Sequence, residues 1–284
     1  MSRIDLRIAT CRELPEPDPD AAPLAAALAA AGLTAALLGW DDPAADWDAP
    51  IPTLVRTPWN YPLTPAAFLA WLDRASAAAP VINPPDVIRS NLRKRYLLAL
   101  AARGVPVVPT LLVEPGQPVD LAALAAPTLV IKPEIGAASF ATRRFAAGDP
   151  AALAHLAALT ADGAALVQPY VASVDDHGER ALIWIDGELS HAIRKTPRFE
   201  GDAEHIAGPF AIADDERAVA EAALAPVADR ILYGRVDVAR DAAGRPMVME
   251  LELIDPSLYF ACCPGSADRF AAALRRALAA LRPG

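Results

Sequence analysis

The stretch Met247–Ser257, with the sequence MVMELELIDPS, decides how the last third of this chain is interpreted. Glu250 and Glu252 stand in a run that is otherwise composed of Met, Val and Leu. Successive side chains of a β-strand point to opposite faces, so these two carboxylates share one face. The upstream run RVDVA has the same alternation, with Arg235 and Asp237 on one face. Two apolar strands therefore each carry a pair of charged groups on one side.

We expect these strands to form an antiparallel hairpin with its turn centred on residues 242–243. This register places Asp237 opposite Val248 and Arg235 opposite Glu250, so that all the charged groups meet on one face. Three carboxylates at such density repel one another unless a cation lies between them, and oxygen ligands suit Mg²⁺ or Mn²⁺. Alternation alone is also satisfied by a half-exposed hairpin whose polar face lies in water. Both explanations remain open at this point.

The composition indicates a folded protein whose ligand is not a nucleic acid. The chain has 284 residues, 54% of them hydrophobic and 21% charged, which suffices for two domains with real cores. Its net charge of -9 opposes the charge of a phosphate backbone. The Ala- and Leu-rich runs read as helices and not as membrane spans. We therefore expect neither a nucleic acid nor a membrane as a partner.

The cysteines indicate neither a zinc site nor a disulfide framework. Cys11, Cys262 and Cys263 are odd in number, and none has CxxC spacing. Residues 1–10 contain no long apolar segment of a signal peptide. We expect a cytoplasmic, reduced protein.

The order of predicted elements indicates an α/β layer followed by an α+β region. Strand and helix patterns alternate over roughly the first 85 residues, which predicts a parallel sheet. The Pro-containing segment 81–88 marks a boundary, and residues 90–104 are predicted to form one helix with Ser90 as its N-cap. In the last third, Asp186-Gly187 lies between two strand patterns and predicts a hairpin with a primed turn.

Two lysines and a small-residue loop are candidate anion ligands. Lys132 ends the apolar run TLVIK, and Lys94 is predicted in the first turn of its helix, where anions are favoured. The loop Gly136–Ser139 would let backbone N–H groups approach phosphate oxygens, although it lacks the P-loop pattern. Taken alone, these features also fit surface lysines and a plain flexible loop. The strand pattern 165–171 can meet an adenine edge or can be an ordinary core strand.

The run VRTPWNYP lies at the end of a predicted strand of the α/β layer, where ligands collect. Arg56, Trp59 and Tyr61 are candidates there for substrate contacts. A surface loop with Trp59 as a packing anchor fits the same pattern.

Taken in order, these motifs resemble the ATP-grasp superfamily. The features are a lysine on an early helix, a lysine ending a strand, a small-residue loop, Arg-x-Asp, and Glu-x-Glu before Pro-Ser. The runs TCRELPEPDPD, VRTPWNYP, NLRKRYLL, VIKPEIGAAS, HAIRKTP and YGRVDVARD are similar to the RimK-like branch that contains O-ureido-D-serine cyclo-ligase, which forms D-cycloserine. The resemblance implies an ATP-grasp fold with a Rossmann-like pre-ATP-grasp domain at 1–88, a small lobe at 89–167 and a C-terminal lobe at 168–284.

The resemblance also implies roles for individual residues. Lys94 and Lys132 would hold the ATP phosphates under the Gly136–Ser139 loop. The adenine site would be lined by Gln168, Tyr170 and Val171, with Asp175 or Asp176 near the ribose. The transferring phosphoryl group and the substrate carboxylate would meet Arg235, Arg194 and Lys195, and the rest of the substrate would meet Arg56, Trp59, Asn60, Arg180 and Ser257.

Asp237, Glu250 and Glu252 would ligate Mg²⁺ or Mn²⁺, with Met249 and Leu251 packing on the reverse face of the hairpin. The implied reaction is ATP-dependent activation of a small amino-acid carboxylate as an acyl phosphate, followed by C–N bond formation. The ligase would either cyclise its substrate in antibiotic biosynthesis or join it to an amine, and a non-catalytic nucleotide-binding protein is the alternative. Relatives commonly form homodimers, so the resemblance also allows a homodimer.

Two positions depart from the family pattern. Glu252 stands where relatives commonly have Asn, which adds a negative charge to the metal site. Asn60 stands where relatives have an acid, and this change puts the amine-bearing substrate of the cyclo-ligase in question.

Overall fold

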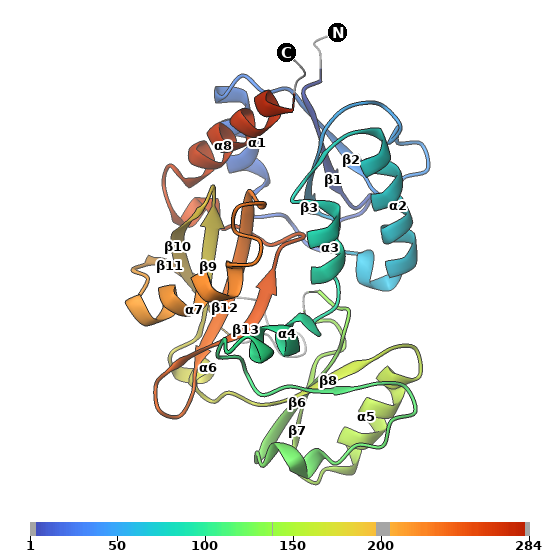
Figure 1. Ribbon diagram of the computed structural model, residues 1–284, viewed down its shortest axis with the longest axis vertical. Coiled ribbons are helices and arrows are strands. Elements are labelled where there is room, and N and C mark those ends of the chain that lie inside the picture. The colour runs from blue at the N-terminus through green and yellow to red at the C-terminus, as the bar shows by residue number, and fades with distance from the viewer. Residues whose placement is uncertain (1–3, 138, 197–204, 282–284) are drawn as a thin grey trace.

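Three sheets organise the chain, and the computed structural model describes residues 4–137, 139–196 and 205–281 (Figure 1). The first sheet is wholly parallel, as predicted, with the order β2 (Ala35–Gly39), β1 (Leu6–Thr10), β3 (Thr53–Thr57) and β4 (Val81–Ile82). Its helices are α1 (Ala21–Ala30) and α2 (Pro65–Ala78).

The central sheet is antiparallel and carries most of the predicted catalytic residues. Its order is β11 (Ile206–Phe210), β10 (Glu188–Lys195), β9 (Glu179–Ile185), β12 (Tyr233–Arg240) and β13 (Pro246–Glu252). The helices of this part are α6 (Ser173–Asp176), α7 (Asp214–Leu224) and α8 (Ser266–Ala280). The predicted Asp186-Gly187 turn is confirmed, because both residues have positive φ, 56° and 85°, as a type I′ turn requires.

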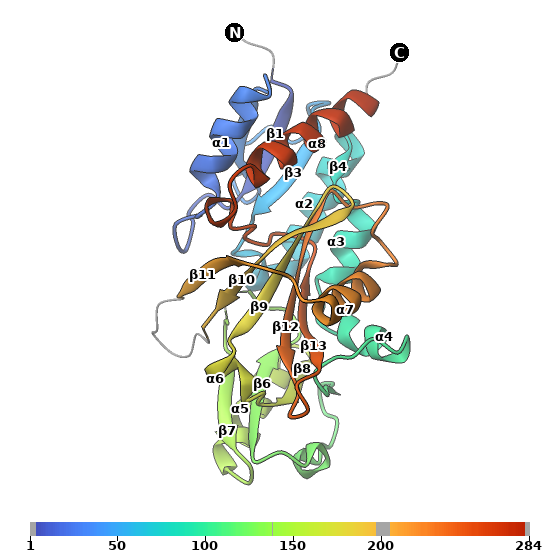
Figure 2. The same cartoon turned by 90° about the vertical axis from the view of Figure 1, so that its left-hand side faces the viewer.

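The third sheet forms a separate small lobe at the end opposite the termini (Figure 2). Its order is β5 (Leu111–Val113), β8 (Ala165–Pro169), β6 (Thr128–Pro133) and β7 (Arg143–Ala146), all antiparallel, with helix α5 (Pro150–Thr160). Helices α3 (Pro85–Asn91) and α4 (Tyr96–Ala102) connect the parallel sheet to this lobe. Short 3₁₀ turns lie at Tyr61–Leu63, Leu121–Leu124 and Phe260–Cys262.

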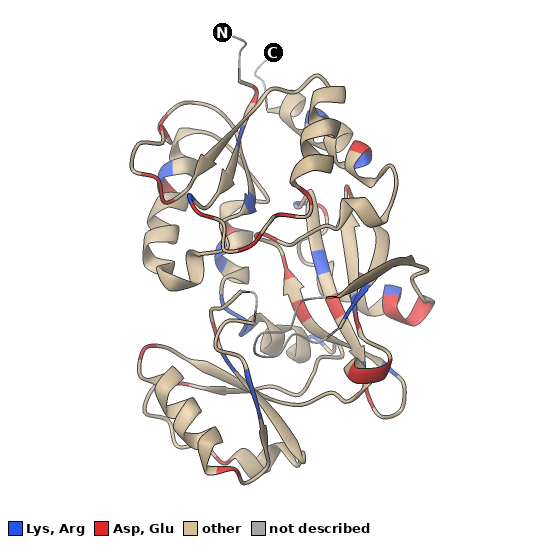
Figure 3. Cartoon of the chain, turned by 180° about the vertical axis from the view of Figure 1, so that it is seen from behind, with Lys and Arg blue, Asp and Glu red and all other residues tan. Residues whose placement is uncertain are grey.

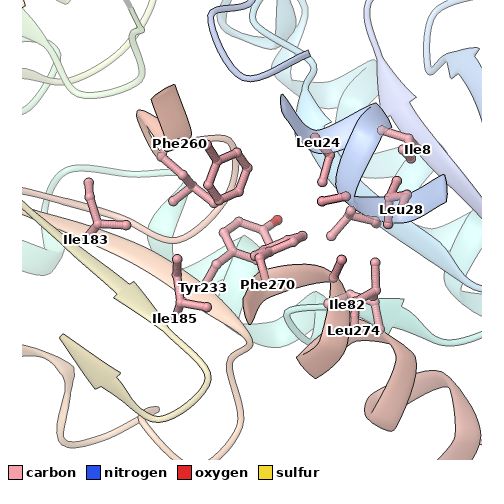
Figure 4. Packing of buried hydrophobic residues seen from close by; sticks show 14 of the residues in the cluster. Ile8, Leu24, Leu28, Ile82, Ile183, Ile185, Tyr233, Phe260, Phe270 and Leu274 are labelled. Atoms are coloured by element: carbon pink, nitrogen blue, oxygen red, sulfur yellow. The ribbon is translucent and has the colours of Figure 1, made fainter. Parts of the chain in front are cut away.

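A continuous apolar core joins the parallel sheet to the central sheet. Tyr233 of β12 packs against Phe270 of α8, and Leu24 and Leu28 of α1 belong to the same buried cluster (Figure 4). The Tyr233 hydroxyl also donates hydrogen bonds to the carbonyls of Val55 and Ile254, 2.9 Å in the latter case. These contacts fix the end of β13 against β3, which is where the substrate residues were predicted.

The single helix predicted for residues 90–104 is wrong, because the chain breaks between α3 and α4. Ser90 lies inside α3, where its hydroxyl donates to the Val87 carbonyl, and is not an N-cap. Lys94 lies in the break, and its backbone N–H donates to the Glu134 carbonyl at 2.9 Å. Arg93 also pairs with the buried carboxylate of Glu134. Tertiary hydrogen bonds to Glu134, the residue after β6, thus replace helical ones at the break.

The predicted hairpin register is also wrong, by two residues. Arg235 pairs with Glu252 and Asp237 with Glu250. The pairing next to the turn is one residue later than predicted, and a bulge in β13 between the partners of Asp237 and Val238 adds the second residue. A shift of two preserves which side chains share a face, so the predicted meeting of the charged groups holds. The bulge changes the neighbours of Met249, which lines the cavity described below instead of packing on the reverse face.

The described residues contain no helix that is both long enough and apolar enough to cross a membrane.

Candidate active site

A cavity of about 250 Å³ lies where the central sheet, the small lobe and the parallel sheet meet. Basic and acidic segments lie close together on the strands around it (Figure 3). Most of the predicted site residues are brought together in its wall: Lys94, Lys132, Gly136, Ser139, Gln168, Tyr170, Val171, Lys195, Arg235, Glu250, Glu252, Trp59 and Ser257. Ala138 of the predicted phosphate loop lies outside the described residues.

The two predicted phosphate lysines face the same wall but differ in their partners. Lys94 forms an ion pair with Glu250. Burial lowers the pKa of Lys94, but the carboxylate of Glu250 more than offsets this effect and raises it above its ordinary value. Lys132 has no hydrogen-bond or ion-pair partner among the described residues, and burial lowers its pKa, with the charge of Lys94 acting in the same direction. An anion that binds here would stabilise the unpaired positive charge of Lys132.

A buried charge network joins three strands of the central sheet at the base of the cavity. Lys195 of β10 contacts Asp237 of β12 at 2.7 Å and Glu179 of β9 at 2.5 Å. Arg235 holds the other oxygen of Asp237 at 2.9 Å. Burial alone would raise the pKa of Asp237, but Arg235 and Lys195 hold it well below its usual range. Burial raises the pKa of Glu179 to about 7.

The three predicted metal ligands lie together, but each is held by a base. Asp237 is completely buried behind Arg235 and Lys195, and Glu252 accepts a hydrogen bond from Arg235 at 2.5 Å. In the described part of the chain, no three His, Cys, Asp or Glu side chains form a cluster that could hold a metal ion. Burial raises the pKa of Glu252, and the carboxylates of Glu250 and Asp237 add to this effect. Carboxylate oxygens are the ligands that Mg²⁺ prefers, so these donors suit the ion by type, but their pairing with Lys94, Arg235 and Lys195 does not gather them around one point.

The predicted adenosine residues lie at the small-lobe side of the cavity. Gln168 is buried at the end of β8, and its amide donates to the Thr110 hydroxyl at 2.8 Å. The aromatic ring of Tyr170 lies under the guanidinium of Arg144, 4.8 Å from the ring centre. Asp175 accepts a hydrogen bond from the Tyr170 hydroxyl and is not part of the cavity lining. Its predicted ribose contact is therefore not supported by its placement.

Two predicted arginines lie away from the cavity. Arg194 alternates with Lys195 along β10, is exposed, and packs over Gly178 and the Phe210 ring, 5.8 Å from its centre. Arg180 is buried, with its guanidinium donating to the Ala211 carbonyl at 2.7 Å. Strand alternation, which placed Glu250 and Glu252 together, separates Arg194 from the catalytic face. The placement of both arginines argues against their predicted roles.

Arg56 and Asn60 lie outside the cavity lining and make hydrogen bonds to other parts of the protein. The Arg56 guanidinium is buried and donates to Asp20 at 3.1 Å and to the Pro256 carbonyl at 3.0 Å. The Asn60 amide donates to Asp41 at 2.7 Å and accepts from the Trp40 indole at 2.6 Å. Neither side chain lines the cavity, so the change to Asn60 does not alter the wall that a substrate would touch.

Several lining residues were not predicted from the sequence. Asp255 lies beyond the end of β13, where strand alternation does not predict the direction of a side chain. Glu179 and Tyr259 belong to no motif that the sequence shows. Glu16 reaches the cavity from the loop before α1. The Pro-rich, acidic run TCRELPEPDPD contains Glu16 and is the one signal that pointed towards it.

The comparisons with known proteins agree with this geometry. Residues 6–83 match the family described as D-cycloserine synthetase DcsG, N-terminal domain. The cycloserine biosynthesis protein DcsG of Streptomyces lavendulae is 39% identical over 284 residues, with 92% of this chain and 94% of the relative covered. A crystal structure of D-cycloserine synthetase DcsG matches with a TM-score of 0.87 and 38% identity, over 96% of this chain and 99% of that chain.

A structure of the ATP-grasp ligase PsnB with minimal precursor, Mg and ADP matches with a TM-score of 0.65 and 19% identity, over 98% of this chain and 99% of that one. That likeness concerns the fold. The ATP-grasp fold and the ligase class predicted from the sequence are thus confirmed. The chain belongs to the DcsG family of ATP-grasp ligases.

Proposed function

We propose that this protein uses ATP and Mg²⁺ to phosphorylate the carboxylate of a small amino acid and then closes a ring by attack of a nitrogen of the same molecule. The relative at 39% identity is described as a cycloserine biosynthesis protein, so an O-ureido-D-serine-type substrate is the first choice. Phosphoryl transfer needs positioning and positive charge more than a protein nucleophile. The cavity wall supplies these groups.

The proposal rests mainly on the lack of a partner for the ammonium group of Lys132. Its side chain is half-buried in the cavity wall that Gly136 and Ser139 also line, and its ammonium group has no partner among the described residues. An unpaired, half-buried cation costs free energy, so a ligand anion is the natural partner. Phosphate oxygens satisfy this requirement. Lys94 lies on the same wall and is placed to bind a second phosphate oxygen once it leaves Glu250.

The carboxylates supply the sites for the metal. Glu250, Glu252 and Asp237 are the residues that would hold Mg²⁺, since their oxygens match its preference and their mutual repulsion is relieved by a cation. Bound Mg²⁺ neutralises charge that develops on phosphate oxygens. Arg235 and Lys195 remain to bind the transferring group and the substrate carboxylate, because both line the cavity.

A screen for ADP release tests the proposal. D- and L-amino acids and O-ureidoserine are each added to the protein with ATP and Mg²⁺, and ADP is measured. We expect Mg²⁺-dependent release stimulated by a subset of the acids. The Glu250→Gln variant should abolish this stimulation, whereas Asp86→Asn, at an exposed ion pair with Arg230, should retain it. Stimulation by no acid at all would refute the proposal.

The nature of the product separates cyclisation from joining to an amine. Mass spectrometry of the reaction should show loss of the substrate with no dependence on an added amine. A product that appears only with an added amine identifies a carboxylate–amine ligase instead. The homodimer and the cytoplasmic location stay predictions, and light scattering after size-exclusion chromatography tests the first.

A further inference from the structure

Asp255 differs from the acids of the neighbouring central sheet because its side chain has no hydrogen-bond or ion-pair partner within residues 4–137, 139–196 and 205–281. Glu250 pairs with Lys94, Glu252 with Arg235, and Glu179 with Lys195. No described residue donates a hydrogen bond to either carboxylate oxygen of Asp255, and its Oδ2 atom is buried. The residue is 8% exposed and lines the cavity. Leaving a buried carboxylate unpaired is costly, so its retention in a ligand cavity indicates a cationic ligand group.

The backbone around Asp255 is held in place by contacts from the parallel sheet. The Trp59 indole donates to the Asp255 carbonyl at 3.2 Å, and Arg56 donates to the next carbonyl, that of Pro256. Asp20 accepts from the backbone N–H of Leu258. The carboxylate is thus presented at a fixed position before any ligand arrives, which reduces the entropic cost of binding.

The surroundings of Asp255 favour an organic cation over a metal ion. Trp59, which contacts the Asp255 backbone, and Tyr61 both line the cavity, and aromatic faces attract ammonium groups. Burial raises the pKa of Tyr61, and the nearby charge of Asp255 raises it further, so the two side chains lie close together. Asp255 is also not one of the three carboxylates, Asp237, Glu250 and Glu252, that are proposed above to hold Mg²⁺.

We infer that Asp255 binds the positively charged α-ammonium group of the amino-acid substrate. This inference rests on the proposed function, because it takes the substrate to be an amino acid. The ammonium group would lie between the carboxylate and the aromatic pair, while the substrate carboxylate points to Lys195 and Arg235. Burial raises the pKa of Asp255 to about 8, and a bound ammonium group would lower it again and supply the missing partner.

A comparison of two ligands that differ only in the ammonium group tests this inference. Binding of D-serine and of 3-hydroxypropionate, which is serine without its α-amino group, is measured by calorimetry with ADP and Mg²⁺ present. O-ureido-D-serine and its deamino counterpart form a second pair. We expect the wild-type protein to prefer each amino compound by about 10- to 100-fold. The Asp255→Asn variant should reduce this ratio to near one.

Three variants keep the test decisive. Asp255→Glu retains the charge and should recover part of the ratio, which a purely structural role would not predict. Asp86→Asn, on the exposed surface, should leave the ratio unchanged. Glu16→Gln removes another carboxylate of the cavity and should also leave it unchanged.

An unchanged ratio in Asp255→Asn overturns the inference, as does a ratio lost in Glu16→Gln. A change only in the Mg²⁺ concentration needed for ADP release would assign Asp255 to the metal and overturn it too. The readout of this test is binding and not turnover. A wild-type protein that releases no ADP would refute the proposed reaction, and the ligand comparison would still decide whether Asp255 binds the ammonium group.

Discussion

The Nζ atom of Lys195 lies 2.7 Å from Oδ2 of Asp237, across strand β9, which separates the strands of the two residues. Both side chains are almost completely buried, at 10% and 1% exposure. Arg235 holds the other oxygen of the same carboxylate. The two bases that are proposed to meet the substrate are therefore positioned by one buried acid.

Replacing Asp237 by Asn should destabilise the protein strongly. The substitution leaves Lys195 and Arg235 buried without a full counter-charge, and breaking a buried pair costs about 3–5 kcal/mol. Urea denaturation followed by tryptophan fluorescence measures the free energy of unfolding. Asp48→Asn breaks the exposed ion pair with Arg74 and should leave that free energy nearly unchanged. Equal small losses in both variants would show that the buried network contributes little to stability.

Lys132 and Lys94 should respond oppositely to replacement by Met. Lys132 has no partner among the described residues, so Lys132→Met removes a half-buried, unpaired charge and should maintain or increase the stability of the ligand-free protein. Lys94→Met leaves Glu250 without its partner and should lower stability.

Both lysine variants should weaken ATP binding, by about 10-fold or more for each lost charged hydrogen bond. Thermal unfolding with and without nucleotide measures both effects. A Lys132→Met variant that loses stability but binds ATP normally would place this lysine in a structural role.

The stability of Asp255→Asn relative to wild type should rise with pH. Burial and the nearby carboxylate of Glu252 raise the pKa of Asp255 to about 8, above its value in the unfolded chain. The folded wild-type protein holds the proton of Asp255 more tightly than the unfolded chain does. This difference stabilises the fold below about pH 4, and the stabilisation is lost progressively as the pH rises towards 8. The Asn side chain does not ionise, so the variant should gain on wild type across this range. Unfolding curves at several pH values between these limits check this expectation, and a difference that is independent of pH contradicts it.

Adjacent residues on β10 should differ sharply in their effect on turnover. Lys195→Gln removes a positive group from the cavity wall and should lower the rate of ADP release by about 100-fold or more. Arg194→Gln changes a side chain that packs on Gly178 and Phe210, so its rate should remain close to that of wild type. Steady-state assays of ADP release by the two variants measure this difference. A large loss in Arg194→Gln would restore the role that the family resemblance implied.

Alternation and motif order were sufficient to predict the face on which Arg235, Asp237, Glu250 and Glu252 meet. They could not predict the bulge in β13, because an extra residue in one strand has no marker in an Ala- or Met-rich sequence. Consequently Met249 was assigned to the wrong face.

Long-range contacts account for the other differences between prediction and structure. The helix break at Lys94 depends on Glu134, which lies far away in the sequence, and neither neighbour of Lys94 is a Pro or a Gly. Asp255 follows the end of a strand, and its position is set by Trp59 and Arg56 of another sheet. Tertiary packing of this kind leaves no periodic signal in the chain.

Transfer of an isotope from the substrate carboxylate to phosphate tests the central claim most directly. The amino acid that best stimulates ADP release is prepared with both carboxylate oxygens as the heavy isotope and turned over in ordinary water with ATP and Mg²⁺. If the carboxylate is activated as an acyl phosphate, each released phosphate should carry one heavy oxygen, which mass spectrometry detects. Phosphate without the heavy isotope, released together with ADP, would show that ATP is hydrolysed by water and would contradict carboxylate activation.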